Sequence, residues 1–451
     1  MHKALLLSIT LILTFSSSFA EETWKAGAAS ITITPGNDLW MAGYGARTAP
    51  AEGTGTDLHA KALLLEDASG HQGLIITMDL VGIGRDLARR ITDELHKAHG
   101  LAREQITLCT SHTHSGPVVG QNLAPLHYES LDPEQQAKIR AYADELVQKV
   151  VTLSGEAYAH LAPATLQSGS GKCTFAVNRR ENKPETEVPA RRATGTLKGP
   201  VDHDVPVLSV RSKTGELQAV LFGYACHATV LSGQVWSADY PGYAQTALET
   251  AFPGAIALFW AGCGGDQNPI PRREIPLAEK YGAELAARVG DVLNSPMPVL
   301  APSLSTTYEE ISASLAPLPT TEQIKANTTS TNRFEVARAR YLLKKLEKQG
   351  PLEAFYPYPI AVWKLGKEID FIFLGGETVV DLALRLKREG RGTSTWVAGY
   401  SNDVMAYIPS LRVRKEGGYE GGESHVYYGL PSLWAETIED EIISAAERLT
   451  K

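Results

Sequence analysis

Short apolar runs and polar turns alternate along most of the chain, and many of the runs are followed by a helical pattern. The apolar, largely β-branched runs lie at 73–80, 105–110, 219–226, 255–262 and 369–376. Such runs, bounded by turn residues, are typical of β-strands. Helical patterns lie at 85–99, 133–153 and 378–389. This alternation predicts an α/β fold in which mixed β-sheets are flanked by helices.

The ends of some elements are marked by specific residues. For the helix at 133–153, Asp132 is the expected N-cap and Pro133 the first helical position. Gln135 is the expected partner in a capping box. The segment 394–403 predicts one more strand before Tyr407, and an amphipathic pattern at 432–449 predicts a closing helix.

One segment departs from the alternating pattern. Residues 313–357 contain a polar stretch and then a charged, helix-like run at 333–350. We interpret this segment as an excursion on the surface, either a lid or subdomain or a solvated helix with no functional role. No clear boundary divides the rest, so 21–451 is expected to form a single domain.

The first twenty residues resemble a secretory signal peptide. Lys3 precedes a short apolar core at 4–15, and Ser18 and Ala20 give a small-x-small cleavage pattern before Glu21. The apolar core is too short to span a bilayer, although a membrane anchor is the alternative. No later apolar stretch reaches about 18 residues. We therefore expect an exported chain, secreted or periplasmic, with no transmembrane segment.

Composition narrows the possible partners. The chain has 451 residues and a formal net charge of −8, with no pronounced cluster of Lys and Arg, so a nucleic-acid partner is not expected. None of the four cysteines, Cys109, Cys173, Cys226 and Cys263, belongs to a Cys-x-x-Cys pair. Cys109, Cys226 and Cys263 lie near the ends of apolar runs, so small buried thiols are the expected state.

Residues able to bind a metal follow several predicted strands. His112, His227, Glu377 and Tyr407 each come just past an apolar run. In α/β sheets, ligands gather beyond the carboxyl ends of strands, so a metal site could form there. In "TSHTHSGP", His114 shares a face with His112 if the segment is extended. The pair could be a metal site, a proton-transfer pair, one of each, or a polar turn.

An ordered set of motifs resembles the neutral (non-lysosomal) ceramidase family. The motifs are "AGAASITITPGNDLWMAGYG", "TGTDLHAKALLLED", "SHTHSGP", "YACHATVLSG", "SADYPGY", "GCGGDQNP", "LGGET" and "NDVMAYIPS" with "GGYEGG". They occur in the family's order and rough spacing, and together they span essentially the whole mature chain.

The resemblance implies a function for individual residues. It implies one Zn²⁺ held by His112, His227, Glu377 and Tyr407. It also implies that His114 lies beside the ion without binding it and handles protons or polarises the scissile carbonyl. By the same resemblance, Arg179 lies near the substrate carbonyl, and Arg180 is the alternative by a one-residue shift. Tyr419 corresponds to a tyrosine whose hydroxyl supports the reacting oxygen.

Three departures from the family bear on the substrate. Asn268 stands where the family has a serine treated as catalytically important, after Asp266, and an amide cannot act as a hydroxyl nucleophile. The chain also ends soon after Tyr419, without the family's C-terminal β-sandwich domain. The residues after Tyr407 read "PSLRVRKEGG" instead of the family pattern.

Three functions are compatible with these features. The first is a zinc-dependent hydrolase that cleaves an N-acyl (amide) bond. The second is a zinc hydrolase on the same scaffold with a glycoside or ester substrate, in which Asp266 or another carboxylate serves as acid or base. The third is a non-catalytic protein that binds a metal or ligand. The expected partner is a small molecule, lipid or glycan, and the sequence leaves the oligomeric state open.

Overall fold

Two β-sheets form the centre of the molecule. The computed structural model describes residues 23–390 and 394–451. The larger sheet has the strand order β11-β9-β8-β6-β1-β3-β4-β5, with parallel pairs only at its two edges, β11–β9 and β4–β5. Its strands are β1 (Trp24–Thr32), β3 (His59–Glu66), β4 (Gln72–Met78), β5 (Ile106–Thr110), β6 (Ala162–Lys172), β8 (Asp204–Ser212), β9 (Leu217–Tyr224) and β11 (Ile256–Ala261).

A second sheet of four strands covers one face of the first. Its order is β13 (Leu304–Ser314), β14 (Phe355–Leu365), β15 (Ile369–Leu374) and β17 (Ser394–Ala398). Side chains alternate along β15. Phe371 and Phe373 pack toward the large sheet, whereas Ile372 and Leu374 pack on the other side. Both faces of this strand are therefore buried, which explains why 371–374 are all apolar.

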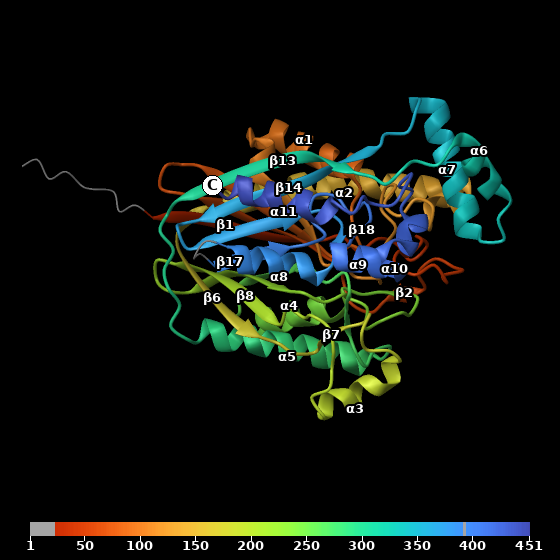
Figure 1. Ribbon diagram of the computed structural model, residues 1–451. Helices are drawn as coiled ribbons and strands as arrows, with labels where there is room; N and C mark the ends of the chain where they lie inside the picture. The colour runs from red at the N-terminus through yellow and green to blue at the C-terminus, as the bar shows by residue number, and fades with distance from the viewer. Residues whose placement is uncertain (1–22, 391–393) are drawn as a thin grey trace, which may run out of the picture.

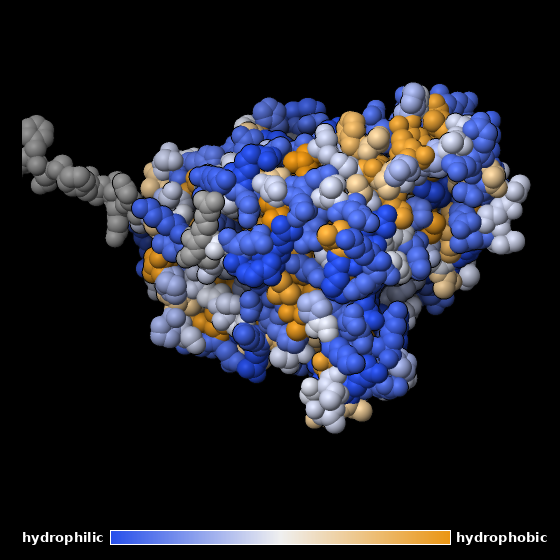
Figure 2. Space-filling view, viewed as in Figure 1, coloured by the Kyte–Doolittle hydropathy of each residue, from blue (hydrophilic) through white to orange (hydrophobic). Residues whose placement is uncertain are grey.

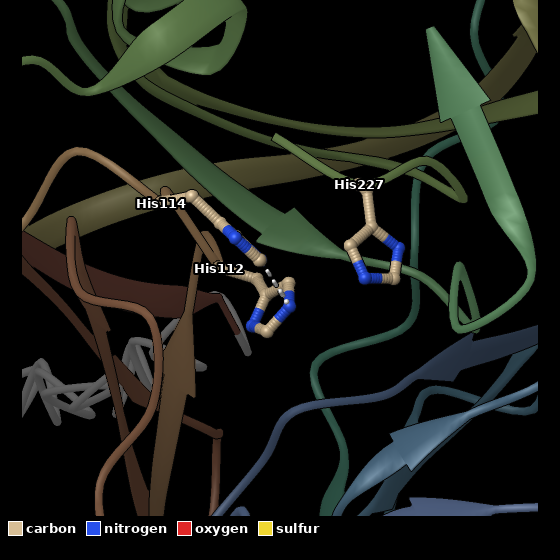
Figure 3. Close-up of side chains that lie close together, drawn as sticks. All are labelled: His112, His114 and His227. Atoms are coloured by element: carbon tan, nitrogen blue, oxygen red, sulfur yellow. Dashed lines mark hydrogen bonds between the residues drawn. The ribbon is translucent and has the colours of Figure 1, made fainter. Parts of the chain in front are cut away.

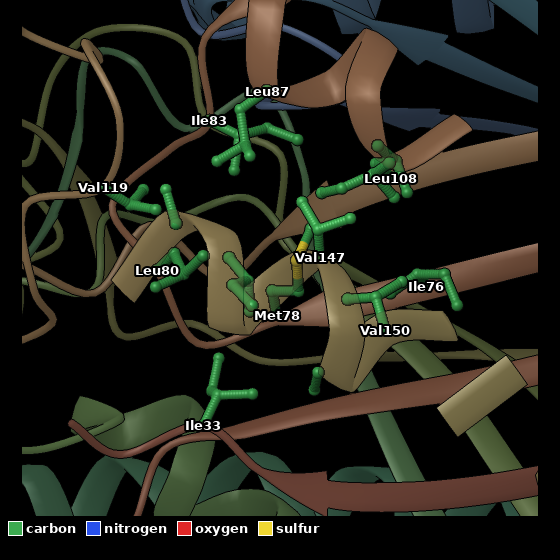
Figure 4. Packing of buried hydrophobic residues seen from close by; sticks show 14 of the residues in the cluster. Ile33, Ile76, Met78, Leu80, Ile83, Leu87, Leu108, Val119, Val147 and Val150 are labelled. Carbon is green, nitrogen blue, oxygen red and sulfur yellow. The ribbon is translucent and has the colours of Figure 1, made fainter. Parts of the chain in front are cut away.

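Helices cover the outer faces of both sheets (Figure 1). Helices α1 and α2 pack on one half of the large sheet, as the cluster in Figure 4 illustrates, and α4 and α5 pack on the other half. Helices α8 and α11 pack on the small sheet. The mixed α/β architecture predicted from the sequence is confirmed. The helices are α1 (Arg85–His99), α2 (Pro133–Ala159), α4 (Asp239–Ala251), α5 (Ile275–Leu293), α8 (Val380–Glu389) and α11 (Ile438–Leu449).

Short elements gather around one end of the sheets, at the right of Figure 1. Three two-stranded pairings, β2–β10, β7–β12 and β16–β18, accompany three short helices. Their bounds are β2 (Gly53–Thr54), β7 (Ala176–Asn178), β10 (Val235–Trp236), β12 (Gln267–Pro269), β16 (Glu377–Thr378), β18 (Tyr407–Ile408), α3 (Val188–Ala193), α9 (Leu411–Glu416) and α10 (Gly418–Gly421).

Helix ends differ from the sequence prediction in detail. Helix α1 has the predicted bounds, but α2 runs to Ala159. Asp132 caps α2 as predicted, because its carboxylate accepts from the Gln135 backbone N–H at 2.8 Å. The predicted capping box is wrong. The Gln135 side chain instead donates to the Asp38 carbonyl at 3.0 Å.

The segment 313–357 is a helical hairpin inserted between β13 and β14. Its helices, α6 (Thr321–Ala326) and α7 (Arg333–Gln349), project from the body of the molecule (Figure 1). Arg338 of α7 is buried and donates to the carbonyl oxygens of Leu430 and Pro431 at 2.7 and 2.8 Å. The hairpin is therefore attached to the C-terminal segment of the chain.

The surface and the ends complete the description. The face shown in Figure 2 is mostly hydrophilic, with apolar side chains near the α6–α7 hairpin. All four cysteines are free and buried, as expected for Cys109, Cys226 and Cys263. Among the residues the structure describes, no helix is both long and apolar enough to cross a membrane. The predicted signal peptide at 1–20 lies outside the described residues.

Candidate metal centre and active site

Four side chains from distant parts of the sequence meet beyond the ends of strands. His112 follows β5 and His227 follows β9. Glu377 and Tyr407 open β16 and β18, which pair in parallel with these two residues opposite each other. The Glu377 backbone N–H also donates to the Ala406 carbonyl at 2.8 Å. Backbone pairing therefore fixes the distance between Glu377 and Tyr407, independently of any contact between their side chains.

The polar atoms of these four side chains converge. Glu377 Oε2 lies 3.0 Å from His112 Nε2 and 3.1 Å from His227 Nε2. His227 Nε2 lies 3.2 Å from the Tyr407 hydroxyl. All four residues are buried. We call His112, His227, Glu377 and Tyr407 the four-residue cluster.

Backbone carbonyls orient both imidazoles. His112 Nδ1 lies 2.5 Å from the Val81 carbonyl oxygen, and His227 Nδ1 lies 2.6 Å from that of Gly264. A carbonyl oxygen can only accept, so each Nδ1 carries the hydrogen and donates. Each Nε2 is then left to face the cluster. Metal-binding histidines are commonly fixed in this way by a contact of their other nitrogen.

Strained backbone conformations occur at the same place. His112 has φ of 58° and Tyr400 has φ of 51°, in the left-handed region that non-glycine residues rarely adopt. Such a conformation costs on the order of 1–3 kcal/mol per residue and persists where the surroundings enforce it. The two rings stack with centroids 4.3 Å apart. The strained residues therefore support each other at the edge of the cluster.

The charges in the cluster are unbalanced without a cation. Burial, reinforced by Arg179, lowers the pKa of His227 to about 4, so its imidazole is neutral at neutral pH. Burial alone would raise the pKa of Glu377, but His112 and His227 outweigh it and hold that pKa well below its ordinary value. An ionised carboxylate thus faces a nitrogen lone pair of His227. This arrangement is unfavourable by itself and is suited to binding a metal ion.

The donor set fits a divalent transition metal. Two imidazole nitrogens, a carboxylate oxygen and a phenol oxygen are within reach of one ion, and zinc binds nitrogen and oxygen ligands in a tetrahedron. The three imidazoles of His112, His114 and His227 form a second available set, with ligand atoms within 4.8 Å of one another (Figure 3). Both sets share His112 and His227.

His114 lies beside the four-residue cluster and contacts His112, not the Glu377 carboxylate. Its Nε2 is 3.0 Å from His112 Nε2, and its Nδ1 is buried with no partner among the described residues. Burial, and then the neighbouring His112 and His227, lower the pKa of His114 well below its ordinary value. At neutral pH this side chain is therefore a neutral imidazole that could accept a proton.

Arg179 joins the cluster from the end of β7. It donates to the Tyr407 hydroxyl at 3.1 Å, to Glu420 Oε1 at 2.7 Å and to Asn268 Oδ1 at 3.2 Å. Arg180 points elsewhere, toward Glu420 Oε2 at 2.8 Å and the carboxylate of Glu416. Of the two adjacent arginines, Arg179 is thus the one placed at the site.

Asp266 and Asn268 have different surroundings, although they are two residues apart. The Asp266 carboxylate accepts from the Val380 backbone N–H at the start of α8 at 3.0 Å, and from Asn178 Nδ2 at 2.9 Å. Burial raises the pKa of Asp266. Asp266 thus holds the start of α8, whereas Asn268 reaches the cluster through Arg179.

Two tyrosines of the C-terminal segment approach the cluster. The Tyr419 ring lies 5.3 Å from the Tyr407 ring and is 43% exposed. The structure gives its hydroxyl no hydrogen bond to another described residue. The Tyr428 hydroxyl, in contrast, donates directly to Glu377 Oε1. Tyr428 therefore supports a candidate ligand from the outer side.

Sequence reasoning missed Tyr400 and Tyr428. Tyr400 lies just past β17 and stacks on His112, so the strand-end rule that selected His112 could also have selected it. Tyr428 follows a 3₁₀ turn at Glu423–Tyr427 and has no such pattern. Glu420, which binds Arg179, carries no recognisable sequence signal either.

The fold and the site define an α/β protein with a candidate metal centre at the carboxyl ends of its strands. Residues 24–262, more than half of the 451, match the sequence profile of the N-terminal domain of neutral/alkaline non-lysosomal ceramidase. The chain therefore belongs to the neutral/alkaline non-lysosomal ceramidase family, a family of hydrolases, and the resemblance found in the sequence is confirmed. A comparison with curated protein sequences gives no match.

Solved structures extend the similarity over the rest of the chain. The crystal structure of neutral ceramidase from Pseudomonas aeruginosa has a TM-score of 0.70 and 19% identity, over 95% of this chain and 75% of that one. A ceramidase complexed with C2 has a TM-score of 0.71 and 18% identity, over 95% and 76%. At this identity the similarity establishes the fold alone. The profile match ends at Gly262, before Glu377 and Tyr407.

Proposed function

We propose that this protein is a zinc-dependent amidohydrolase that cleaves an N-acyl bond, with its ion held by the four-residue cluster. The observation that carries the proposal is the convergence of His112 Nε2, His227 Nε2 and the Glu377 carboxylate in a buried site. A zinc ion bound there supplies Lewis-acid polarisation of a carbonyl and a lowered pKa for water.

His114 carries the proton-transfer role in this proposal. It is neutral at neutral pH because burial lowers its pKa, and Nε2 lies beside the cluster. The imidazole nitrogen that carries no hydrogen accepts a proton from the attacking water, and the imidazolium then gives a proton to the leaving nitrogen, as general acid–base catalysis requires. His114 is therefore assigned as a proton carrier and not as a ligand.

Arg179 and Tyr419 stabilise the developing oxyanion. Burial would lower the pKa of Arg179, but Tyr407 and Glu420 outweigh it and hold the pKa well above its ordinary value, so the guanidinium stays charged. Its bonds to Tyr407 and Glu420 fix its orientation. Preorganised donors of this kind are typically the largest electrostatic contribution to acyl transfer. Tyr419, whose ring lies 5.3 Å from that of Tyr407, contributes its hydroxyl to the same oxyanion.

An amide is favoured over a glycoside as the substrate. Glycosidases use two carboxylates on opposite sides of the scissile bond. Here the Glu377 carboxylate faces two imidazoles, and that of Asp266 is used by Val380 and Asn178. Asn268 has no hydroxyl for an acyl-enzyme, which favours direct attack by water. We propose that the substrate is an N-acyl compound with a more polar character than ceramide.

The cellular location is part of the same proposal. We propose that residues 1–20 direct export and are removed before Glu21, on the pattern of Lys3, the apolar core and the small residues at 18 and 20. Amino-terminal sequencing of the protein recovered from its native compartment tests this. A mature chain that begins at Met1 would refute it.

The function is tested by metal removal and a substrate panel. The purified chain is expected to contain about one zinc per protomer and to lose activity with a chelator, with recovery on adding Zn²⁺. The panel compares short N-acyl amides, ceramide, aryl glycosides and aryl esters. Amide hydrolysis that requires the metal supports the proposal. Preferred turnover of a glycoside or ester, or activity that is insensitive to metal removal, would refute it.

A further inference from the structure

Three arginines surround Tyr44 at the His114 side of the site. The Arg273 guanidinium lies 5.1 Å from the Tyr44 ring centroid and donates to the Tyr44 hydroxyl at 2.8 Å. The Arg47 guanidinium lies 5.3 Å from the same centroid. Arg333, from α7, donates to the carbonyl oxygen of the next residue, Gly45. We call Arg47, Arg273 and Arg333 the arginine rim.

The arginine rim adjoins the reacting groups. The Tyr44 ring packs on the His114 ring with centroids 4.9 Å apart, and Arg47 donates to the His114 carbonyl oxygen at 2.8 Å. Gly43 has φ of 90°, and a Cβ there would lie 2.6 Å from the His114 ring. The loop can approach this closely only because residue 43 is glycine. The rim is thus built against the proton-carrying histidine.

No carboxylate of the described residues forms an ion pair with the arginine rim. The other arginines nearby do have such partners: Arg179 binds Glu420, and Arg272 binds Glu185 at 3.0 Å. Arg47 is 7% exposed, and besides Gln234 it donates only to backbone carbonyls. Buried charges are normally paired, so an unpaired buried guanidinium is unusual.

The rim remains positively charged at neutral pH. Burial lowers the pKa of Arg47 only to about 10. The carboxylate that influences this corner is Asp239, which is fully buried and accepts from the backbone N–H groups of Leu231 and Tyr240 at 2.8 and 2.7 Å. Burial raises the Asp239 pKa to about 6, so it offsets at most one of the three positive charges.

The positive charge gathered in the arginine rim attracts anions, although the protein as a whole has a net charge of −8. We propose that the amide substrate carries an anionic oxygen group on its amine portion, and that Arg273 and Arg333 bind this group while Arg47 supports it from below. We place the anionic group on the amine portion because His114, which protonates the leaving nitrogen in the proposed mechanism, packs against Tyr44. This inference rests on the proposed function and adds the substrate class to it.

Matched substrate pairs test the charge and its position. N-octanoyl-β-alanine is compared with N-octanoyl-β-alaninamide, and N-octanoylethanolamine phosphate with N-octanoylethanolamine, to distinguish a carboxylate from a phosphate. The octylamide of succinic acid carries its carboxylate on the acyl side. For at least one pair, kcat/KM is expected to favour the anion by about tenfold to a hundredfold, falling as salt rises.

Variants test the residues. In Arg273→Gln/Arg333→Gln the ratio of kcat/KM between the anionic and the neutral member of each pair is expected to fall close to one. In Arg273→Lys/Arg333→Lys the charge is kept, so much of the preference should return. The control Arg288→Gln/Arg340→Gln removes two exposed arginines elsewhere and should keep the preference. Melting temperatures show whether each variant is folded.

The outcomes separate this inference from the proposed function. If the enzyme cleaves amides but treats anionic and neutral pairs alike, prefers the acyl-side carboxylate, or keeps its preference without Arg273 and Arg333, the inference is overturned and the proposed function stands. If no amide is cleaved, calorimetry with the sulfonamide N-octylsulfonyl-β-alanine and its carboxamide decides. Equal binding of the two, or equal binding to wild type and double glutamine variant, overturns the inference.

Discussion

His227 and Tyr419 both approach Tyr407, but the protein holds them in opposite ways. His227 is 1% exposed, and its Nδ1 is fixed by the Gly264 carbonyl. Tyr419, on the four-residue helix α10, is 43% exposed, and only ring contacts place it. We call the four-residue cluster the inner half of the site and Tyr419 and Tyr428 its outer half. The inner half is built on strand ends, whereas the outer half is built on short irregular segments.

This difference separates two tasks. Strand ends held by backbone hydrogen bonds give the rigid geometry that a metal ion requires. The outer segments can adjust to a substrate, since few hydrogen bonds fix their side chains. We therefore expect substitutions in the inner half to abolish metal binding, and substitutions in the outer half to change affinity or rate.

The largest effect is expected from the inner histidines. His112→Ala and His227→Ala each remove a nitrogen that lies about 3 Å from the Glu377 carboxylate and that belongs to both available ligand sets. Each variant should lose its metal and its activity. Metal analysis after dialysis measures this, with His71→Ala, a histidine that contacts Thr306 away from the site, as the control. Unchanged metal content in both variants would show that the inner half is not the metal centre.

His114→Ala should give a large loss of rate with the metal retained. Removal of a general acid–base group typically lowers the rate by about 10²–10⁴-fold. Metal content and kcat are measured on the same preparation. If His114→Ala loses metal as readily as His112→Ala, then His114 belongs to the ligand set and the three-imidazole arrangement is correct.

The outer support of Glu377 should have an intermediate effect. Tyr428→Phe removes the hydroxyl that donates to Glu377 Oε1 while keeping the ring. Loss of a hydrogen bond to a metal ligand typically lowers metal affinity or activity by about 10–100-fold. Competition with a chromophoric chelator gives the metal affinity, and Tyr427→Phe, the neighbouring tyrosine, is the control. Equal affinities of wild type and Tyr428→Phe would mean that the outer half does not reach the metal.

The smallest effect on catalysis should come from a substitution of Asp403. The backbone carbonyl of Asp403 accepts from the Gly376 backbone N–H at 2.7 Å and so supports the turn before Glu377. Burial raises its carboxyl pKa from 3.8 to about 7, against the opposing hydrogen bond from Tyr356. Because the pKa of this carboxyl is raised in the folded state, its contribution to the free energy of unfolding is fully present below pH 3.8. That contribution is lost as the pH rises through about 7.

Asp403→Asn removes that titration and keeps an acceptor for Tyr356. The free energy of unfolding of the variant is compared with that of wild type at each pH. The difference should be more favourable to the variant at pH 8 than at pH 4, by on the order of 1–3 kcal/mol. Urea unfolding at the two pH values measures the change, and activity with the metal bound should be nearly unchanged. A difference between variant and wild type that does not depend on pH would contradict the assignment.

The sequence predicted that His112, His227, Glu377 and Tyr407 lie just beyond strands, because the rules that mark a strand act locally. The run 369–376 marks a strand buried on both faces, and Glu377 follows it directly. The helix at 85–99 was predicted at its correct bounds from its periodicity alone. The fold class and the family were likewise predicted correctly.

The outer half was harder to predict because its contacts depend on tertiary structure. Nothing in the sequence around Tyr428 indicates that its hydroxyl reaches Glu377, 51 positions away. Gln135 fits a capping box by sequence, but the Asp38 carbonyl, brought close by the fold, takes its side chain. The segment 313–357 was recognised as unusual, but its attachment to Leu430 through Arg338 was not.

The two-residue ladder between β16 and β18 limits how this site can be redesigned. Glu377 and Tyr407 are aligned by main-chain pairing, and the Gly265 N–H holds the Thr378 carbonyl at 2.9 Å from the other side. Side-chain length is therefore the adjustable variable at position 377. An engineer who replaces the glutamate by aspartate keeps the charge but withdraws the carboxylate by one methylene, and the immobile backbone offers no compensating shift. An aspartate at position 377 is therefore expected to weaken metal binding, although it keeps the charge.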